Sequence, residues 1–288
     1  MSTRISKIDD ALYSLNRKEN IKNDMLKSSS FSFGYIPDEP DSRDYQINQI
    51  LSTDYKSEKF SIDYTNEMSP VKSQGQLGAC VAFAIASVIE WQQQKEYLYE
   101  KQSGSNYIRE DNHYDLSEQW IYRKSKEIDD WPNSEGTSIR TGLKIVNQYG
   151  VPVEKAWPYS DTKIGKPSFW SFSTAKWNKN KKYYRINGLN ELKNTLLNIG
   201  PCVIGVVVFK EFFYPNNGVI NYPDNPNQRY GGHAICCCGF DDNKKLIKFK
   251  NSWGYNWGLN GYGYLPYNYI NDYMIDAWVT IDDNILSL

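Results

Sequence analysis

The hydrophobic and polar positions of this chain follow different patterns in its two halves. Residues 81–91 are apolar on almost every side and rich in alanine, which favours a buried helix over a strand. A second helix is predicted to start at residues 116–119, and a third to span 138–148, because Gly150 follows it as glycine commonly follows helix ends. Residues 101–115 are polar, with Gly and Asn, and predict a loop.

Beyond about residue 160 the pattern changes to short β-type runs separated by Gly, Asn, Asp and Pro. A helical part over about 61–160 followed by a β-rich part over about 161–288 predicts an α+β fold with two lobes and a cleft between them. The predicted strands cover residues 202–209, 234–240, 246–250 and 278–281.

The first 60 residues differ from both halves. Four apolar positions near the start form one stripe of an amphipathic helix, and the prolines within residues 34–45 favour an extended path. The segment has too few apolar residues for its own core, so we expect a helix and an extended strap that lie on the rest of the chain. The alternative is a partly disordered tail. The helical stripe consists of Ile5, Ile8, Leu12 and Leu15.

Composition and charge exclude several classes of partner. The chain has 288 residues, of which 40% are hydrophobic and 23% charged, as in a globular protein with a real core. Its net charge is −1 and no block of Lys and Arg stands out, so we expect neither a nucleic acid nor a membrane as partner. The longest apolar runs, such as residues 203–209, have the length of a strand and are too short to span a membrane.

The cysteines and the N-terminus bear on the compartment. The first ten residues carry charges where a secretory signal needs apolar residues. Three of the five cysteines are adjacent, which suits neither a disulfide framework nor a single metal ion, because successive strand residues face opposite sides. We therefore expect no metal, no cofactor and no disulfide, and an intracellular or virion-associated location. The cysteines are Cys80, Cys202, Cys236, Cys237 and Cys238.

Three positions could carry chemistry. Of the two histidines, His113 lies in a polar loop, whereas His233 lies where a loop enters an apolar run and is the better general base. Cys80 begins the predicted helix 81–91, where the helix dipole favours a thiolate, although a buried inert thiol is the alternative. Asn251 opens a stretch rich in Gly and aromatics and could orient an imidazole, or that stretch could be a long turn that packs the core.

Together these elements resemble the papain family of cysteine peptidases. Residues 70–80, which read PVKSQGQLGAC, look like the family's nucleophile motif, and Gly232-His233-Ala234 looks like its histidine motif. Residues 250–263, KNSWGYNWGLNGYG, match its asparagine motif closely. The order Cys, His, Asn is right, and both gaps are somewhat longer than the family's roughly 130–150 residues, which suggests insertions.

The resemblance implies a role for each matched residue. Cys80 would be the nucleophile, and His233 its base and later its acid, with a thiolate–imidazolium pair at rest. Asn251 would orient His233, and Trp253 would shield their hydrogen bond from water. Gln74 would supply a side-chain N–H to the oxyanion hole beside the backbone N–H of Cys80.

Some positions depart from the family's pattern without removing a catalytic group. Leu77 stands where the family usually has a disulfide cysteine, and Val81 replaces the usual Trp after the nucleophile. Gly232 resembles the cathepsin B branch, but His113 lies in a different interval from that branch's occluding loop. Removal of dipeptides is therefore not supported.

Substrate contacts are predicted at three positions. Gly136 corresponds to the strand that pairs with substrate backbone, and Gly232 lies beside the catalytic histidine. Trp278 is either the floor of the pocket for the second residue before the scissile bond, which would make that pocket shallow and apolar, or a plain core residue.

The resemblance implies a two-lobed papain-like fold, with a helical left lobe, a β-barrel-like right lobe and the active site in the cleft. Residues 1–60 would be a pro-segment and 61–288 the peptidase domain. The expected activity is endopeptidase cleavage of peptides or proteins through a thioester, with the N-terminal segment as an intramolecular inhibitor. A papain fold that binds without catalysing, and a thiol-dependent acyltransferase, are the alternatives.

Overall fold

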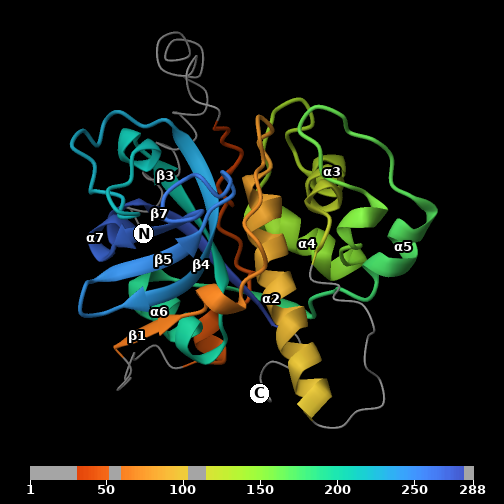
Figure 1. The fold of residues 1–288 in the computed structure, drawn as a ribbon, viewed down its shortest axis with the longest axis horizontal. Helices are drawn as coiled ribbons and strands as arrows, with labels where there is room; N and C mark the ends of the chain where they lie inside the picture. The colour runs from red at the N-terminus through yellow and green to blue at the C-terminus, as the bar shows by residue number, and fades with distance from the viewer. Residues whose placement is uncertain (1–30, 52–59, 103–114, 282–288) are drawn as a thin grey trace.

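The computed structural model describes residues 31–51, 60–102 and 115–281. The predicted N-terminal helix and His113 lie outside these residues. One long helix, α2 (Cys80–Gln102), stands between a twisted sheet and a group of shorter helices (Figure 1). This arrangement confirms the α+β fold with two lobes.

Helix α2 is the central wall of the molecule. Its N-terminal half is buried on nearly every side, from Cys80 to Trp91, because it packs against the sheet on one side and other helices on the other. The helix continues to Gln102, so its last two residues belong to the segment predicted as a loop. Its polar C-terminal half adds length that the apolar run did not indicate.

The helical lobe contains α3 (Glu118–Ile128), α4 (Ile139–Tyr149) and the short α5 (Phe169–Ala175). Ser117 and Ser138 cap the first two, because each side chain accepts a backbone N–H of the first turn. Gly150 ends α4 with a positive φ of 76°, a conformation that glycine adopts without strain. Both predicted helices are confirmed.

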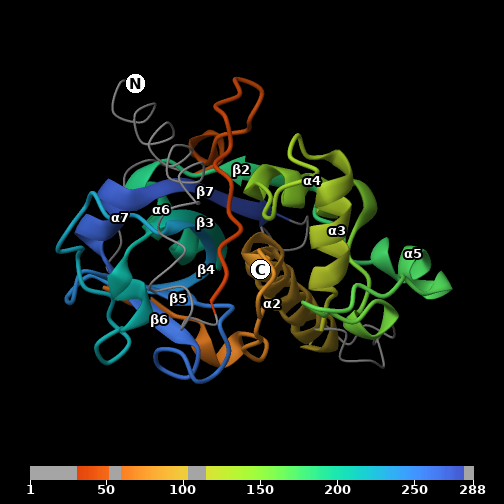
Figure 2. The same ribbon diagram turned by 90° about the horizontal axis from the view of Figure 1, so that it is seen from above.

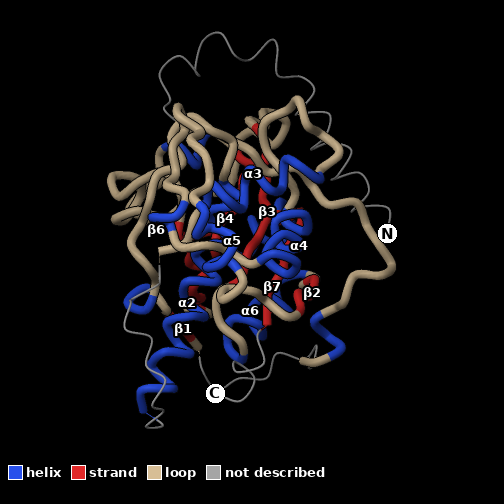
Figure 3. The backbone as a smooth tube through the Cα atoms, turned by 90° about the vertical axis from the view of Figure 1, so that its right-hand side faces the viewer, coloured by secondary structure: helices blue, strands red, loops and turns tan. Residues whose placement is uncertain are grey.

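The other lobe is built on one antiparallel sheet. The described residues form seven strands, six of them in the order β2-β7-β3-β4-β5-β6, with β1 paired to β4. Figure 3 shows these strands behind the helices of the first lobe. All four predicted strands are present, β4 and β7 with longer bounds. The strands are β1 (Ser61–Asp63), β2 (Lys182–Arg185), β3 (Cys202–Val208), β4 (Gly231–Asp241), β5 (Leu246–Lys250), β6 (Tyr262–Pro266) and β7 (Met274–Ile281).

Two helices of the sheet lobe were not predicted. Helix α6 (Gly188–Asn198) buries Leu192 and Leu196, and α7 (Tyr267–Tyr273) buries Tyr269, Ile270 and Tyr273. Short 3-10 turns complete the description, at Ile47–Gln49, Thr65–Glu67, Glu154–Ala156 and Lys210–Phe213. None of the helices within the described ranges has both the length and the apolar character needed to cross a membrane.

Residues 31–51, here called the strap, run between the two lobes. Seen from above, they pass between α2 and the sheet for most of the width of the molecule (Figure 2). Tyr35 pairs in parallel with Thr137 of the helical lobe, and its backbone N–H donates to the carbonyl of Gly232 on β4 at 3.3 Å. The strap therefore contacts both walls of the cleft.

Candidate active site

Cys80 is the first residue of α2 and faces the sheet. Its side chain has no solvent exposure, and the backbone N–H of Ala234 on β4 donates to its sulfur at 3.5 Å. Further backbone N–H groups, those of Val81 and of Gly34 in the strap, also lie against the thiol. The helix N-terminus thus places the sulfur directly beside the residue that follows His233.

His233 lies in β4, and Asn251 directly follows the neighbouring strand β5. Nε2 of His233 and Oδ1 of Asn251 are 2.8 Å apart. The same oxygen accepts the backbone N–H of Ser252 at 2.8 Å, which fixes the amide so that its oxygen faces the imidazole. Nε2 therefore carries the proton in the neutral ring. Nδ1 is buried and has no hydrogen-bond partner among the described residues.

Trp253 covers the histidine. Its ring stacks on the imidazole of His233, with centroids 4.6 Å apart and planes inclined by 29°. Phe212 meets both rings edge-on. Water is excluded from the hydrogen bond between His233 and Asn251, which strengthens it.

Gln74 is held from three directions. Its backbone N–H donates to the carbonyl of Ser252 at 2.9 Å, and its own carbonyl accepts the hydroxyl of Tyr159 at 2.7 Å. The Ser252 hydroxyl donates to Oε1 at 2.6 Å, so the amide N–H₂ group must point the other way. Nε2 donates to the carbonyls of Leu77 at 3.0 Å and of Ser32 in the strap at 3.1 Å. A strap carbonyl therefore occupies a donor predicted for the oxyanion hole.

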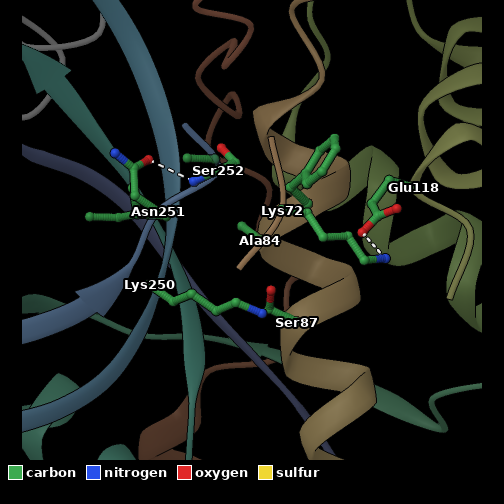
Figure 4. A pocket seen from close by; sticks show the side chains of 10 residues that line it. Lys72, Ala84, Ser87, Glu118, Lys250, Asn251 and Ser252 are labelled. Atoms are coloured by element: carbon green, nitrogen blue, oxygen red, sulfur yellow. Dashed lines mark hydrogen bonds and ion pairs between the residues drawn. The ribbon is translucent and has the colours of Figure 1, made fainter. Parts of the chain in front are cut away.

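A small pocket with both polar and apolar lining lies between α2 and the end of β5 (Figure 4). Asn251 and Ser252 line it from the sheet side, and Lys72 and Glu118, 2.8 Å apart, line it from the helical side. Lys250 reaches across toward α2 and donates to the hydroxyl of Ser69 at 2.8 Å. These charged groups lie at the interface between the lobes and help to fix the two walls of the cleft relative to each other.

The burial of the pair changes its protonation. Burial raises the pKa of the Cys80 thiol to about 11, against the opposing effect of the surrounding N–H donors. Burial also lowers the pKa of His233 to about 4, although the hydrogen bond with Asn251 acts the other way. Both shifts favour the neutral forms of the thiol and the imidazole, whereas the resemblance implies a thiolate–imidazolium pair.

Two of the three predicted substrate-binding residues contact the strap, and the third is buried. Gly136 and Gly232 both contact the strap: a Cβ on Gly136 would lie 2.4 Å from the Gly34 carbonyl oxygen, and one on Gly232 would lie 2.8 Å from that of Tyr35. Trp278 is fully buried, and the guanidinium group of Arg185 lies over its indole ring, 5.2 Å from the ring centroid. Its role in substrate binding stays a prediction.

The described residues contain no group of three or more His, Cys, Asp or Glu side chains that could hold a metal ion. All five cysteines are free thiols in this structure. The chemistry available at the site is therefore that of a thiol beside an imidazole, with an amide that orients the imidazole and N–H donors around the sulfur.

The comparison of the sequence with protein families agrees with this geometry. The family of papain cysteine proteases matches residues 58–281, and the chain belongs to this family. It is a papain-like cysteine peptidase, and its substrates are peptides or proteins.

Individual relatives place the chain more closely. It is 33% identical over 282 residues to an uncharacterized peptidase C1-like protein of Acanthamoeba polyphaga mimivirus, covering 87% of this chain and 86% of that protein. Cathepsin K of Mus musculus is 29% identical over 239 residues, which are 80% of this chain and 66% of that protein.

Solved structures show the same fold. Xylellain, a cysteine protease from Xylella fastidiosa, superposes with a TM-score of 0.71 at 30% identity, covering 88% of this chain and 96% of that one. Digestive procathepsin L 3 of Tenebrio molitor larval midgut superposes with a TM-score of 0.63 at 20% identity, covering 97% and 89%.

Sequence reasoning missed three residues at the cleft. Tyr35 of the strap donates its hydroxyl to Asp276 on β7, and Asp276 also pairs with Arg185 on β2. No local pattern joins these positions. A charged residue inside the apolar run of β7 was the available signal, since buried carboxylates are nearly always paired.

Proposed function

We propose that this peptidase cleaves peptide bonds through Cys80, His233 and Asn251. Nδ1 of His233 takes the thiol proton as the Cys80 sulfur attacks the substrate carbonyl carbon, and it gives that proton to the leaving amine as the C–N bond breaks, which leaves a thioester on Cys80. Water then attacks the thioester with His233 as base, and the acid product departs as the thiol is restored. Asn251 keeps Nδ1 of the imidazole available by holding Nε2.

The observation that carries this proposal is where His233 lies relative to Asn251 and Cys80. Nε2 is taken by Asn251 at 2.8 Å, while Cys80 accepts the N–H of the next residue, Ala234. The buried and unpartnered Nδ1 is then the ring atom that serves the sulfur. The Nε2–H of Gln74 and the backbone N–H of Cys80 would stabilise the oxyanion.

The strap supports the proposal of endopeptidase activity, because it is an extended chain that continues on both sides of Cys80. On one side Phe31 stacks on Trp253 with ring centroids 4.5 Å apart. On the other side Tyr35 pairs with Thr137 and Gly232. A cleft that holds extended backbone in both directions from the nucleophile suits cleavage within a chain.

We also propose that residues 1–60 hold the enzyme inactive and that residues 61–288 are the peptidase domain. The strap covers Cys80 and occupies the Gln74 donor, and it presents an N–H group, that of Gly34, to the sulfur. The family match begins at residue 58, near this boundary. Release of the strap would open the cleft and let water reach the catalytic pair.

The chemistry is tested by labelling the full chain with a thiol-directed epoxide and locating the adduct. We expect a single adduct at Cys80, and hydrolysis of peptides without added amine that is lost in Cys80→Ala. An adduct at Cys202 or at residues 236–238 would overturn the assignment. Turnover only with an added amine would indicate an acyltransferase, and peptide binding without turnover a non-catalytic papain fold.

Inhibition by the strap is tested without deleting it. A Cβ on Gly34 would lie 1.8 Å from the backbone oxygen of Gly78. The strap of Gly34→Ala therefore cannot pack against Gly78, which lies two residues before Cys80. We expect this variant to react faster with the epoxide and to cleave peptides faster than the wild type. Ser42→Ala, at an exposed strap position, is the matched control. Equal rates in all three proteins would show that the strap does not inhibit.

A further inference from the structure

The side chain of Tyr35 fills a pocket that belongs to the peptidase domain. Its ring lies flat on two glycines of neighbouring strands: a Cβ on Gly205 would be 2.2 Å from the ring carbon Cζ, and one on Gly232 would be 2.9 Å from Cδ1. Gly205 lies opposite Asp276 in the pairing of β3 with β7. The three residues therefore share one face of the sheet, toward the cleft.

The floor of this pocket is polar. The Tyr35 hydroxyl donates to Oδ2 of Asp276, which also accepts the backbone N–H of Asp38 at 2.8 Å. Oδ1 of Asp276 is paired with Arg185, whose other terminal nitrogen lies 3.2 Å from Asp44. Asp276 is 1% exposed and Arg185 4%, so both charges are buried and satisfied only as a group.

The partners of Asp276 belong to two parts of the chain. Tyr35 and Asp38 lie in the strap, whereas Arg185, like Asp276 itself, lies in the domain. When the strap leaves, Oδ2 loses both of its N–H and O–H donors and faces the open pocket as an acceptor. A buried acceptor without a donor is costly, so an occupant with a hydrogen-bond donor is favoured.

The pocket lies one residue away from Cys80 along the strap and one residue away from His233 along β4. Gly34, which precedes Tyr35, presents its N–H to the Cys80 sulfur, and Gly232 precedes His233. A substrate residue whose side chain entered this pocket would therefore have its backbone beside the nucleophile. We take it as the second residue before the scissile bond.

We propose that this pocket recognises a tyrosine side chain of the peptide substrate, with Asp276 as the acceptor of the phenol hydroxyl. The inference rests on the proposed peptidase function and adds a specificity to it. The two glycines provide a flat surface for the ring, and the carboxylate at the end distinguishes a phenol from a plain phenyl group. Phe and Leu leave Oδ2 without a donor.

The charges around the pocket favour a tyrosine side chain over a lysine or an arginine, which a carboxylate could also attract. With the strap gone, Asp38 and Asp44 no longer balance Arg140 and Arg185, and Asp276 is the remaining carboxylate of this cluster. Two guanidinium groups then face one carboxylate. A lysine or arginine side chain would enter a pocket with an excess of positive charge.

The test uses the full chain carrying Gly34→Ala and four peptides that differ only in the second residue before the scissile bond: Tyr, O-methyltyrosine, Phe and Arg. We expect kcat/KM for Tyr to exceed that for Phe by about 10- to 100-fold, since the Phe peptide leaves a buried acceptor unpaired. O-methyltyrosine keeps the phenolic oxygen but has no hydroxyl hydrogen to donate, so kcat/KM for this peptide should fall to the value for Phe or below. Equal cleavage of Tyr and Phe, or a preference for Arg, would overturn the proposal while leaving the peptidase function intact.

A second arm does not need catalysis. The peptides are titrated calorimetrically into Gly34→Ala combined with Cys80→Ala, and tighter binding of the Tyr peptide is expected. That preference would support the pocket even if Gly34→Ala with Cys80 intact cleaved none of the peptides, an outcome that would reject the proposed function alone. Equal binding of Tyr and Phe would reject the pocket.

A steric variant completes the test. Gly205→Ala places a methyl group where the ring lies, so cleavage of the Tyr peptide should fall much more than cleavage of an otherwise identical Ala peptide. A parallel loss for both peptides would contradict the placement of the side chain on Gly205. Circular dichroism spectra of the variant check that the sheet is retained.

Discussion

The two walls of the cleft position their reactive groups by different means. On the helical wall, Cys80 is fixed by one element, the start of α2, and its environment is made largely of backbone N–H groups. On the sheet wall, His233 and Asn251 come from two strands and meet only because β4 and β5 are held in one register. The position of Cys80 depends on local structure, and the positions of His233 and Asn251 depend on long-range pairing.

This difference shows where the site is sensitive. A helix N-terminus is set by the residues next to it, so the sulfur stays in place as long as α2 forms. The imidazole needs strand register, the fixed amide of Asn251 and the covering ring of Trp253 together. The sheet wall should therefore respond gradually to substitution, and the helical wall in an all-or-none manner.

The largest expected effect comes from removing the reactive groups of both walls. In the Gly34→Ala background, Cys80→Ala and His233→Ala should each lower kcat by about 10⁴-fold or more, and the double variant should be no worse than either, because the two act as one unit. Single-turnover cleavage of a fluorogenic peptide measures this, with Cys202→Ala as an active control. Losses that multiply in the double variant would mean that the walls act independently.

The next effect concerns the oxyanion donor between the walls. Gln74→Ala should lower kcat by about 10²–10³-fold with little change in KM, since the donor acts on charge that develops in the transition state. Tyr159→Phe is the matched control, because it removes a contact to the Gln74 backbone and leaves the side-chain amide. If Tyr159→Phe cost as much as Gln74→Ala, the loss would reflect the position of the loop and not the donor.

A smaller effect is expected on the sheet wall. Asn251→Ala removes the buried hydrogen bond to His233, together with the one from the Ser252 backbone N–H, and should lower kcat/KM by roughly 5- to 150-fold. The bond to His233 raises the pKa of His233, so the NMR titration midpoint of the imidazole should move to lower pH in the variant. The chain has two histidines, and His113→Gln assigns the signals. A midpoint that rises would contradict the orientation assigned to Asn251.

The smallest effect is a pH dependence of the strap, which bridges the walls. Burial, and then the charge of Asp276, raise the pKa of Asp38 from its ordinary 3.8 to about 7, against the opposing effect of Arg140. The docked strap therefore binds a proton that the free strap releases. This contribution to docking is complete below about pH 3.8 and is lost as the pH rises through about 7.

The prediction is tested by replacing the titrating group. Asp38→Asn should weaken the dependence of docking on pH between 5 and 8. The ratio of epoxide reaction rates at Cys80, variant to wild type, cancels the titration of the thiol itself. We expect this ratio to fall as the pH rises, and a ratio that stays constant would exclude Asp38 as the group responsible.

The sequence predicted those parts of the molecule that local signals determine. Helices α3 and α4 follow from Ser117, Ser138 and Gly150, and strands β3 to β5 follow from apolar runs with turns between them. Helix α6 was missed although Leu192 and Leu196 have helical spacing, because it lies in the part of the chain read as strands. The matched motifs predicted Cys80, His233 and Asn251 as catalytic residues through family resemblance, and this assignment stays a prediction.

What local signals could not supply is contact between distant segments. Tyr35 and Asp276 are 241 residues apart and meet because β3 and β7 pair beneath the strap. Neither residue has a spacing or a neighbour that identifies the other. The pKa shifts of Cys80 and His233 were likewise outside local reasoning, since they depend on the burial of both groups in the folded chain.

The close approach of Gly34 to Gly78 has a kinetic consequence. In the proposed inhibition by the strap, the enzyme becomes active at the rate at which the strap dissociates, and that rate depends on how tightly the strap fits where Gly34 meets Gly78. At that point a single added carbon atom would collide with the backbone. The residence time of the strap, and with it the delay before the first turnover, can therefore be set by one side chain without altering any residue of the peptidase domain.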